Sequence, residues 1–256
     1  MRSTAARPAG RRVSSSRGGA APTRTERVVE RRVERDTERD TERDVERESA
    51  ADYIPSRPTL QKLRVAAAGC HGCHLWRLGT QTVFGEGPSR ARLMIVGEQP
   101  GDQEDRAGRP FVGPSGSLLE AALAEAGLDR GDVYVTNVVK HFKWESRGEK
   151  SARRIHKTPN SSEIRACRPW LDTEIRLVRP ALLLCLGATA AKALVGNDFR
   201  ITRERGKPVT VPEFPTVMAT VHPSAVLRTP RESRAKAERA FVADIERAAR
   251  WLGENG

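Results

Sequence analysis

The sequence predicts an α/β fold of three layers, in which helices cover both faces of a central four-stranded parallel sheet. Four short apolar runs, each bounded by polar or turn residues, have the length and continuity of strands buried on both faces. Segments with helical spacing separate these runs, and strands that alternate with helices form parallel sheets. The four runs are Leu93–Val96, Val133–Val135 with Val138–Val139, Ala181–Leu184 and Val217–Val221.

The segments between and after these strands carry their own helix signals. Gly127 stands where a C-terminal cap ends the first helix, and Asn160 with Glu163 forms a capping pair that opens the second. A short Ala-rich helix is expected after Gly187. The apolar faces consist of Leu118, Leu119, Ala122, Leu123 and Ala126 in the first helix, Ile164, Leu171, Ile175 and Val178 in the second, and Phe241, Ile245, Ala249 and Leu252 in a terminal one.

The charge of the chain points to an anionic partner. Its 256 residues carry 45 Lys+Arg against 33 Asp+Glu, a formal net charge of +12, which favours nucleic acid without locating the surface that binds it. No stretch approaches the roughly 20 apolar residues that a membrane helix needs, and the N-terminus lacks the apolar segment of a secretory signal. We therefore expect a cytoplasmic protein with no membrane partner, whose four cysteines are reduced thiols, metal ligands or catalytic groups.

Residues 1–52 are expected to form a tail, and residues 53–256 the folded domain. Residues 1–24 contain six arginines and no acid, and residues 25–52 contain seven arginines and eleven acids, partly in a Thr-Glu-Arg-Asp repeat. Neither segment has enough apolar side chains to bury a core. A disordered basic arm followed by a solvated charged repeat is the main expectation, and a nucleic-acid-binding arm is the alternative.

Ligands of such sheets bind beyond the carboxyl ends of the strands, where several polar residues lie. After the first strand, a loop rich in glycine and proline could bring backbone N–H groups close to a ligand, although an ordinary turn-rich connection explains the same residues. An Asn at a strand end can pair with a planar amide such as a base edge. A His there is more often structural than catalytic, but this one would face the same crevice. The residues are Glu98, Gln99, Asp102 and Phe111 in the loop, Asn137 after the second strand, and His222 with Ser224 after the fourth.

A basic segment, Arg147 to Lys157, lies between the second strand and the second helix. At the mouth of the crevice its cations should contact phosphates, although charged runs are usually just solvated loops. His156 adds a nucleophile-capable imidazole among those cations. Arg153, Arg154 and Lys157 are three of these cations.

The four cysteines allow three interpretations. Cys70 and Cys73 form a Cys-x-x-Cys pair, whereas Cys167 and Cys185 come from distant predicted elements. Four thiolates could hold an iron–sulfur cluster or zinc, and unrelated core thiols remain the third possibility. A zinc ribbon would normally supply a second Cys-x-x-Cys, which is absent, so zinc is less favoured. Pro169, inside the second helix, would locally break its hydrogen bonding and could help aim the Cys167 thiolate.

Taken together, the motifs over about residues 55–250 resemble the type-4 uracil-DNA glycosylases, the iron–sulfur branch of the uracil-DNA glycosylase superfamily. The resemblance rests on the Cys-x-x-Cys, the Gly-Glu-x-Pro-Gly loop, Pro-Phe-Val-Gly, Thr-Asn, the Cys167/Cys185 pair and His-Pro-Ser. Gln99 and the run Arg153-Arg154-Ile155-His156-Lys157 narrow it to the UdgX-type subgroup. That run usually has Lys before the two arginines, whereas this chain has Ala152, which could weaken DNA affinity slightly.

The resemblance implies a role for each site residue. Phe111 would stack on a flipped-out uracil, Asn137 would pair with its N3–H/O4 edge, and His222 would stabilise charge on O2. Gln99, Asp102 and Ser224 would shape the substrate pocket. A 4Fe-4S cluster would be held by Cys70, Cys73, Cys167 and Cys185, near the N-terminal extension of the domain.

The function implied is uracil excision from DNA, after which His156 attacks the deoxyribose C1′ and retains the abasic site covalently, with Glu98 accepting the other imidazole N–H. One alternative is a conventional turnover type-4 glycosylase in which His156 contacts phosphate. The other is a non-catalytic iron–sulfur DNA-binding protein. We expect uracil-containing DNA as the partner, single-stranded rather than double-stranded, and a monomer associated with the nucleoid through DNA.

Overall fold

The computed structural model describes residues 49–146, 148 and 153–255. Most of the predicted tail and part of the basic segment therefore lie outside the described residues. Regular structure is present before residue 53, the expected start of the domain: Ser49 caps a 3-10 helix, η1 (Ala50–Tyr53), and Ala50 is buried against the core. No helix in the described part of the chain has the length and apolarity to cross a membrane.

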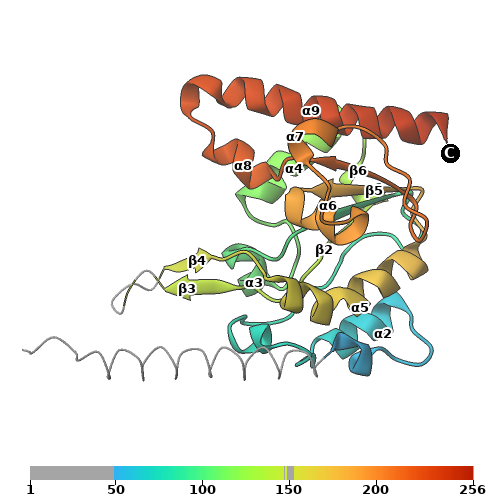
Figure 1. Ribbon diagram of the computed structural model, residues 1–256, viewed down its shortest axis with the longest axis vertical. Helices are drawn as coiled ribbons and strands as arrows, with labels where there is room; N and C mark the ends of the chain where they lie inside the picture. Colours follow the sequence, from blue (N-terminus) through green and yellow to red (C-terminus); the bar gives the residue numbers. More distant parts are fainter. Residues whose placement is uncertain (1–48, 147, 149–152, 256) are drawn as a thin grey trace, which may run out of the picture. The chain divides into compact units, whose positions relative to one another are not determined.

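The predicted sheet is confirmed. Its four strands are all parallel, in the order β2-β1-β5-β6, and they occupy the centre of the fold in Figure 1. Every residue of β1, β2 and β5 is buried, as expected for strands covered on both faces. The strands are β1 (Leu93–Gly97), β2 (Val133–Asn137), β5 (Leu182–Leu186) and β6 (Thr216–Thr220).

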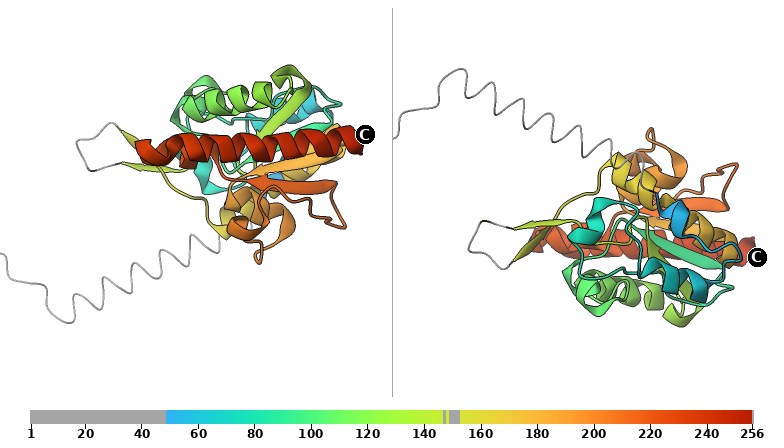
Figure 2. Two further views of the ribbon diagram at one scale, coloured as in Figure 1. Left: turned by 90° about the horizontal axis from the view of Figure 1, so that it is seen from above. Right: turned by 90° about the horizontal axis from the view of Figure 1, so that it is seen from below.

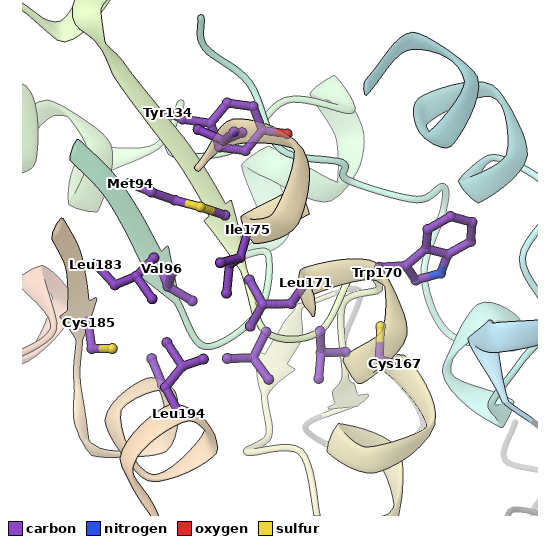
Figure 3. Close-up of a cluster of buried hydrophobic side chains, with 14 of the residues drawn as sticks. Met94, Val96, Tyr134, Cys167, Trp170, Leu171, Ile175, Leu183, Cys185 and Leu194 are labelled. Atoms are coloured by element: carbon purple, nitrogen blue, oxygen red, sulfur yellow. The ribbon is translucent and has the colours of Figure 1, made fainter. Parts of the chain in front are cut away.

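Helices cover both faces of the sheet, so the three-layer prediction is also confirmed. In Figure 2 the view from above has α9 in front of the sheet, and the view from below has α2 and α5 in front. Alternate strand residues enter the two cores; Met94, Val96 and Leu183 pack toward α5 and α6 in Figure 3. One layer contains α4 (Pro114–Glu125), α8 (Pro223–Arg228) and α9 (Arg231–Glu254), and the other contains α2 (Leu60–Ala67), α5 (Ser161–Val178) and α6 (Ala188–Val195).

The helix ends follow the sequence signals closely. Gly127 has a φ of 73° just after α4, and Asn160 and Glu163 form the capping box of α5. Two details differ from prediction. Helix α5 continues through Pro169 without a break, and in α9 Ala248 rather than Ala249 is buried, because the buried stripe follows the helical period after Ile245.

The basic segment does not form a plain loop. The residues just before it form β3 (Trp144–Ser146), which pairs as an antiparallel hairpin with β4 (Arg154–His156) inside the segment, and Trp144 is opposite His156. Figures 1 and 2 show this hairpin extending from the fold near α3. Sequence patterning missed it because each strand has only three residues. The sequence also did not predict η1, α2 or α8. Further elements that it did not predict are α3 (Asp102–Ala107), α7 (Ile201–Glu204) and two 3-10 helices, η2 (His74–Arg77) and η3 (Arg130–Asp132).

The strand order reverses between β1 and β5, and this is where a ligand crevice is expected in an open parallel sheet. The loops after these two strands meet there, because the Thr189 hydroxyl donates a 2.5 Å hydrogen bond to Glu98 Oε2. The topology therefore places the predicted loop residues at the reversal point.

Candidate functional site

A cavity of about 1040 Å³ opens at the carboxyl ends of the strands. It brings together residues that come from four separate parts of the chain. Of the predicted substrate-side residues, Lys157 alone does not line it. The lining includes Glu98, Gln99, Asp102, Phe111, Asn137, Arg153, Arg154, His156, His222 and Ser224.

The floor of the cavity is built around Gly97, the last residue of β1. Gly97 pairs in register with Asn137 of β2. A Cβ at Gly97 would lie 2.3 Å from Asn137 Oδ1 and 2.8 Å from Phe111 Cζ. The Asn amide and the Phe ring edge therefore meet directly over the glycine, and a larger residue would displace them.

Phe111 reaches this position through an uncommon backbone conformation. Its φ is 56°, in the left-handed region that bulky residues rarely adopt and that clusters at functional sites. Gly116 permits it, because a Cβ there would lie 1.8 Å from the Phe111 carbonyl oxygen. The ring is thereby turned over the end of β1.

A buried ionic network lies beneath Asn137. Lys140 Nζ donates to the Asn137 carbonyl oxygen at 2.7 Å and to Glu174 Oε2 at 2.5 Å, and both charged residues are fully buried. The Tyr134 hydroxyl donates to Glu174 Oε1 at 2.9 Å. Sequence reasoning missed this network, because a Lys after Val138 and Val139 resembles an ordinary surface residue. Breaking such a pair on one side leaves an uncompensated buried charge.

His222 is held in one tautomer. It is the N-cap of α8, and Nδ1 accepts the Ser224 backbone N–H at 3.1 Å, so in the neutral ring the proton resides on Nε2. Burial lowers the pKa of His222 to about 4, and the charges of His156 and Arg228 act in the same direction. His222 is therefore neutral at physiological pH, with Nε2–H as its donor.

His156 faces the carboxylate of Glu98. Its Nε2 lies 3.5 Å from Glu98 Oε1, and its side chain is 48% exposed. Burial lowers the pKa of His156; Glu98 opposes this effect and Arg228 adds to it. The uncharged ring, which has a lone pair available for bonding, is thereby favoured.

Arg228 is a site residue that sequence reasoning missed. It lines the cavity at the end of α8, and its positive charge lowers the pKa of both His156 and His222. An Arg six residues beyond His222 offers no signal by itself, because its position depends on the direction in which α8 leaves the sheet.

Gln99 lines the cavity, and its amide also makes hydrogen bonds that the sequence did not predict. Its Oε1 accepts the Lys143 N–H at 3.0 Å, and its Nε2 donates to the carbonyl oxygens of Lys143 (3.1 Å) and Lys157 (3.0 Å). Lys143 precedes β3 and Lys157 follows β4. The Gln99 amide therefore fastens both strands at the base of the hairpin.

Arg154, a predicted phosphate contact, makes ion pairs that the sequence did not predict. Its guanidinium donates hydrogen bonds to Asp102 Oδ1 and Asp105 Oδ2, each at 2.5 Å, and its side chain is only 11% exposed. It also lies 5.2 Å from the Phe142 ring centroid and 5.6 Å from that of Trp144. Arg154 and Asp102 therefore attach the hairpin to α3. Two carboxylates thus already engage the guanidinium, and the expectation that Arg154 contacts a DNA phosphate stays a prediction.

The other two predicted phosphate contacts remain exposed. Arg153 lines the cavity. Lys157 Nζ lies 2.8 Å from Glu145 Oε1, and both side chains are about half exposed, so water and DNA can compete for this pair. The expectation that these two residues contact phosphate stays a prediction.

Comparison with known proteins identifies a family and several relatives of this chain. The family model of the uracil DNA glycosylase superfamily matches residues 84–246 of this chain. The type-4 uracil-DNA glycosylase of Thermotoga maritima is 38% identical over 188 residues, which cover 73% of this chain and 91% of that protein. That of Pyrobaculum aerophilum is 39% identical over 180 residues, 67% of this chain and 86% of that protein. The chain belongs to the uracil-DNA glycosylase superfamily. A type-5 uracil-DNA glycosylase of Thermus thermophilus is 32% identical over 130 residues, 45% of this chain and 54% of that protein.

In this member of the uracil-DNA glycosylase superfamily, three cysteines lie in one region. Burial raises the pKa of Cys167, and the neighbouring thiols of Cys73 and Cys70 raise it further. The indole N–H of Trp170 donates to Cys70 Sγ and the backbone N–H of Lys140 to Cys167 Sγ, each at 3.3 Å. Such N–H···S bonds suit sulfur atoms that carry negative charge, as cluster ligands do.

Cys185 is not brought to the other three. It lies in β5, and Figure 3 shows its sulfur beside Leu183 and Leu194, with Leu171 and Ile175 between it and Cys167. Burial raises its pKa to about 12, while Arg168 acts to lower it. Among the residues that the structure describes, no group of three or more His, Cys, Asp or Glu has a metal-binding arrangement. Three of the predicted cluster ligands thus lie in one region of the fold, whereas Cys185 lies apart from them.

Proposed function

We propose that this protein excises uracil from DNA and then holds the abasic site covalently through His156. One observation carries the proposal: the hairpin brings His156 into the cavity that holds Phe111, Asn137 and His222, with Nε2 3.5 Å from the Glu98 carboxylate. The residues that distinguish the UdgX-type subgroup support it, since Gln99 fastens the hairpin that carries His156.

Uracil recognition follows from the floor of the cavity. The base must be flipped out or already single-stranded to reach it. Phe111 would stack on the ring, and the Asn137 amide would accept from N3–H and donate to O4. Cytosine presents the opposite donor and acceptor pattern and would leave buried polar groups unpaired, which is strongly disfavoured.

Cleavage of the N-glycosidic bond is assigned to His222. Because Nδ1 is engaged by the Ser224 N–H, Nε2–H would donate to uracil O2. As the N1–C1′ bond breaks, its electron pair leaves with uracil, and this hydrogen bond stabilises the developing negative charge. The sugar becomes oxocarbenium-like, and a nearby carboxylate favours that cation.

Capture is assigned to His156. One imidazole nitrogen uses its lone pair to form a bond to C1′, while the other ring nitrogen gives its proton to Glu98. The products are a neutral N-substituted imidazole, a protonated Glu98 carboxyl and the uracil anion; Glu98 then returns its proton to water and the uracil anion takes one up, which gives free uracil. Water is not consumed, so one protein molecule retains one DNA molecule.

The decisive experiment is a denaturing gel with matched uracil-containing and thymine-containing single-stranded oligonucleotides. Wild type should give a protein–DNA band with uracil DNA only. His156→Ala should lose that band completely while still releasing uracil, because His222, Asn137 and Phe111 are unchanged. A wild type that yields only free abasic DNA would overturn the capture step.

A conventional turnover glycosylase is the second candidate, favoured by the relatives of high coverage, which are named type-4 uracil-DNA glycosylases. In that case one protein molecule would process many substrates. A non-catalytic DNA-binding protein would treat uracil and thymine DNA alike and lose affinity steeply as salt rises. The same gel, run with substrate in excess, separates all three. Preference for single-stranded DNA, a monomeric state and a cytoplasmic, nucleoid-associated location remain predictions.

The cofactor proposed is a 4Fe-4S cluster at Cys70, Cys73 and Cys167, which would crosslink the loop before η2 to α5. For the fourth ligand we propose His141 in place of Cys185. His141 is buried and directly follows Lys140, whose N–H bonds Cys167. Its Nε2 forms a hydrogen bond with Thr82 Oγ1, and the Thr82 hydroxyl already donates its proton to the Ala67 carbonyl oxygen. Nε2 must therefore be the donor, so it carries the proton and Nδ1 has the lone pair.

Metal analysis of single variants tests this assignment. Cys185→Ser should retain the full iron and sulfide content and the visible absorption of wild type, whereas His141→Ala and Cys167→Ser should lose iron. Loss of iron from Cys185→Ser with retention in His141→Ala would restore Cys185 as the ligand. Zinc in place of iron would exclude the cluster.

A further inference from the structure

The segment Cys70–Thr80, which carries two of the clustered cysteines, also contacts the hairpin that carries His156. We propose that Trp144 and Glu163 are positioning residues that seat this hairpin on the segment and thereby set the position of His156. This proposal rests on the proposed function for its measurement of covalent capture. Its measurement of amide hydrogen exchange does not depend on that function.

The first contact is made by Trp144. Its indole N–H donates to the Leu78 carbonyl oxygen at 2.7 Å, and Trp144 is the cross-strand partner of His156 in the β3–β4 ladder. Leu78 directly follows η2, the one-turn helix that begins after Cys73. A shift of the segment at Leu78 would therefore be transmitted to the residue opposite the nucleophile.

The second contact is made by Glu163, which is fully buried. Its carboxylate lies 3.1 Å from His74 Nε2, accepts from Lys143 Nζ at 2.9 Å, and accepts the Asn160 N–H at 2.6 Å. These partners belong to the cysteine segment, the base of the hairpin and the start of α5. One carboxylate thus joins both sides of the proposed cluster site to the hairpin.

The third contact lies at the far end of the segment. Thr80 Oγ1 is 3.2 Å from Arg154 Nη1, and the Thr80 N–H donates to Asp105 Oδ1 at 2.8 Å. Arg154 is in β4, two residues before His156. The segment therefore contacts both strands of the hairpin.

The segment Cys70–Thr80 has little regular structure of its own, so its position depends on these contacts. Between Cys70 and Thr80 its regular structure is η2, of four residues, and such irregular segments open locally at low free-energy cost. A crosslink at Cys70 and Cys73 would restrict that opening. The clustered cysteines would therefore stabilise the hairpin, and with it the approach of His156 to Glu98, without touching the substrate.

The test compares Trp144→Phe, which keeps an aromatic ring but removes the donor to Leu78, with Trp76→Phe. Trp76 lies in the same segment and stacks on His71 instead, so it serves as a matched control. For the carboxylate, Glu163→Gln is compared with Glu145→Gln, which removes the exposed pair with Lys157 within the hairpin. Iron content, uracil release, covalent capture and amide hydrogen exchange of residues 153–157 are measured in each.

We expect Trp144→Phe and Glu163→Gln to keep their iron and their rate of uracil release, while capture slows about tenfold and exchange of residues 153–157 rises about tenfold, as the loss of one buried hydrogen bond allows. The two control variants should match wild type. Cys73→Ser should raise exchange of the same residues although Trp144 is intact.

The proposal is wrong if residues 153–157 exchange at the wild-type rate in both positioning variants, or if the controls change them equally. It is also wrong if uracil release falls in step with capture, since that indicates general loss of structure. Failure of the proposed function gives a different result: wild type would form no adduct, whereas the exchange comparison would still report whether the hairpin is seated on the segment.

Discussion

The two sides of the cavity are held in different ways. On the floor, Asn137 is positioned by the β1–β2 ladder, and His222 by its place as N-cap directly after β6. On the opposite side, His156 is carried by a hairpin of two three-residue strands that side chains from other elements attach to the fold. Asn137 and His222 thus depend on backbone hydrogen bonds, whereas the proposed nucleophile depends on Gln99, Arg154 and Trp144. The two sides should respond differently to substitution.

The largest effect is expected from Gly97→Ala, which disturbs the floor and leaves the hairpin contacts intact. The added Cβ would force Asn137 or Phe111 to move, and loss of base pairing should reduce uracil release on the order of a thousandfold. Capture should fall equally, because no abasic sugar is produced. Single-turnover uracil release measures this, with Gly253→Ala as control, since a Cβ there meets nothing within 4 Å. Near-wild-type release would show that the floor is more adaptable than the sheet implies.

Arg154→Met disturbs the hairpin alone. Removing the guanidinium leaves the buried Asp105 carboxylate without this partner, and the free energy of unfolding should fall by about 3 kcal/mol. Denaturant unfolding measures this loss. Capture should fall more than uracil release does.

DNA affinity measured at several salt concentrations separates anchoring from phosphate contact. The slope of log affinity against log salt should be unchanged in Arg154→Met and should fall by about one in Arg153→Met. A slope that changes in Arg154→Met would return Arg154 to the DNA interface.

A smaller effect on stability is expected when the pH is lowered, and it arises from His222 on the floor of the cavity. The pKa of His222 in the fold is about 4, below the ordinary value of about 6.5 in the unfolded chain, so the unfolded chain binds the proton first as pH falls. The contribution of neutral His222 to the free energy of unfolding is therefore fully present above about pH 6.5. About 1.5 kcal/mol of it should be lost as the pH falls from about 6.5 to about 5.

Urea unfolding across this pH range provides the measurement. His222→Asn keeps an N-cap side chain for α8 and should remove most of this pH-dependent loss. If the full dependence persists in this variant, His222 is not the group that titrates.

The sequence predicted the floor well because its residues obey local rules. Buried parallel strands produce continuous apolar runs, and residues that directly follow such runs must meet at one edge of the sheet. Glu98, Asn137 and His222 were located in this way, and the capping box of α5 was identified from Asn160 and Glu163. The hairpin lacked such a signal, since three-residue strands are too short to show alternation.

Roles that depend on partners distant in sequence could not be assigned in advance. Gln99 and Asp102 follow β1 and were expected to contact substrate, yet they bond residues more than 40 positions away. Cys185 has the same residue type as the three gathered cysteines, but its position in β5 sends it into the core beside Leu183 and Leu194. Lys140 and Arg228 resembled ordinary surface cations until the fold placed one beneath the floor and the other at the mouth.

The sequence by itself therefore determined the layers, the sheet, the edge at which the site lies and the family resemblance, because periodicity and capping act over a few residues. Tertiary structure alone decided which of the polar residues face the cavity and which hold the hairpin. A side chain with several hydrogen-bonding atoms bonds whatever the fold brings within reach, and buried polar groups must find partners. That choice is made only when distant segments meet.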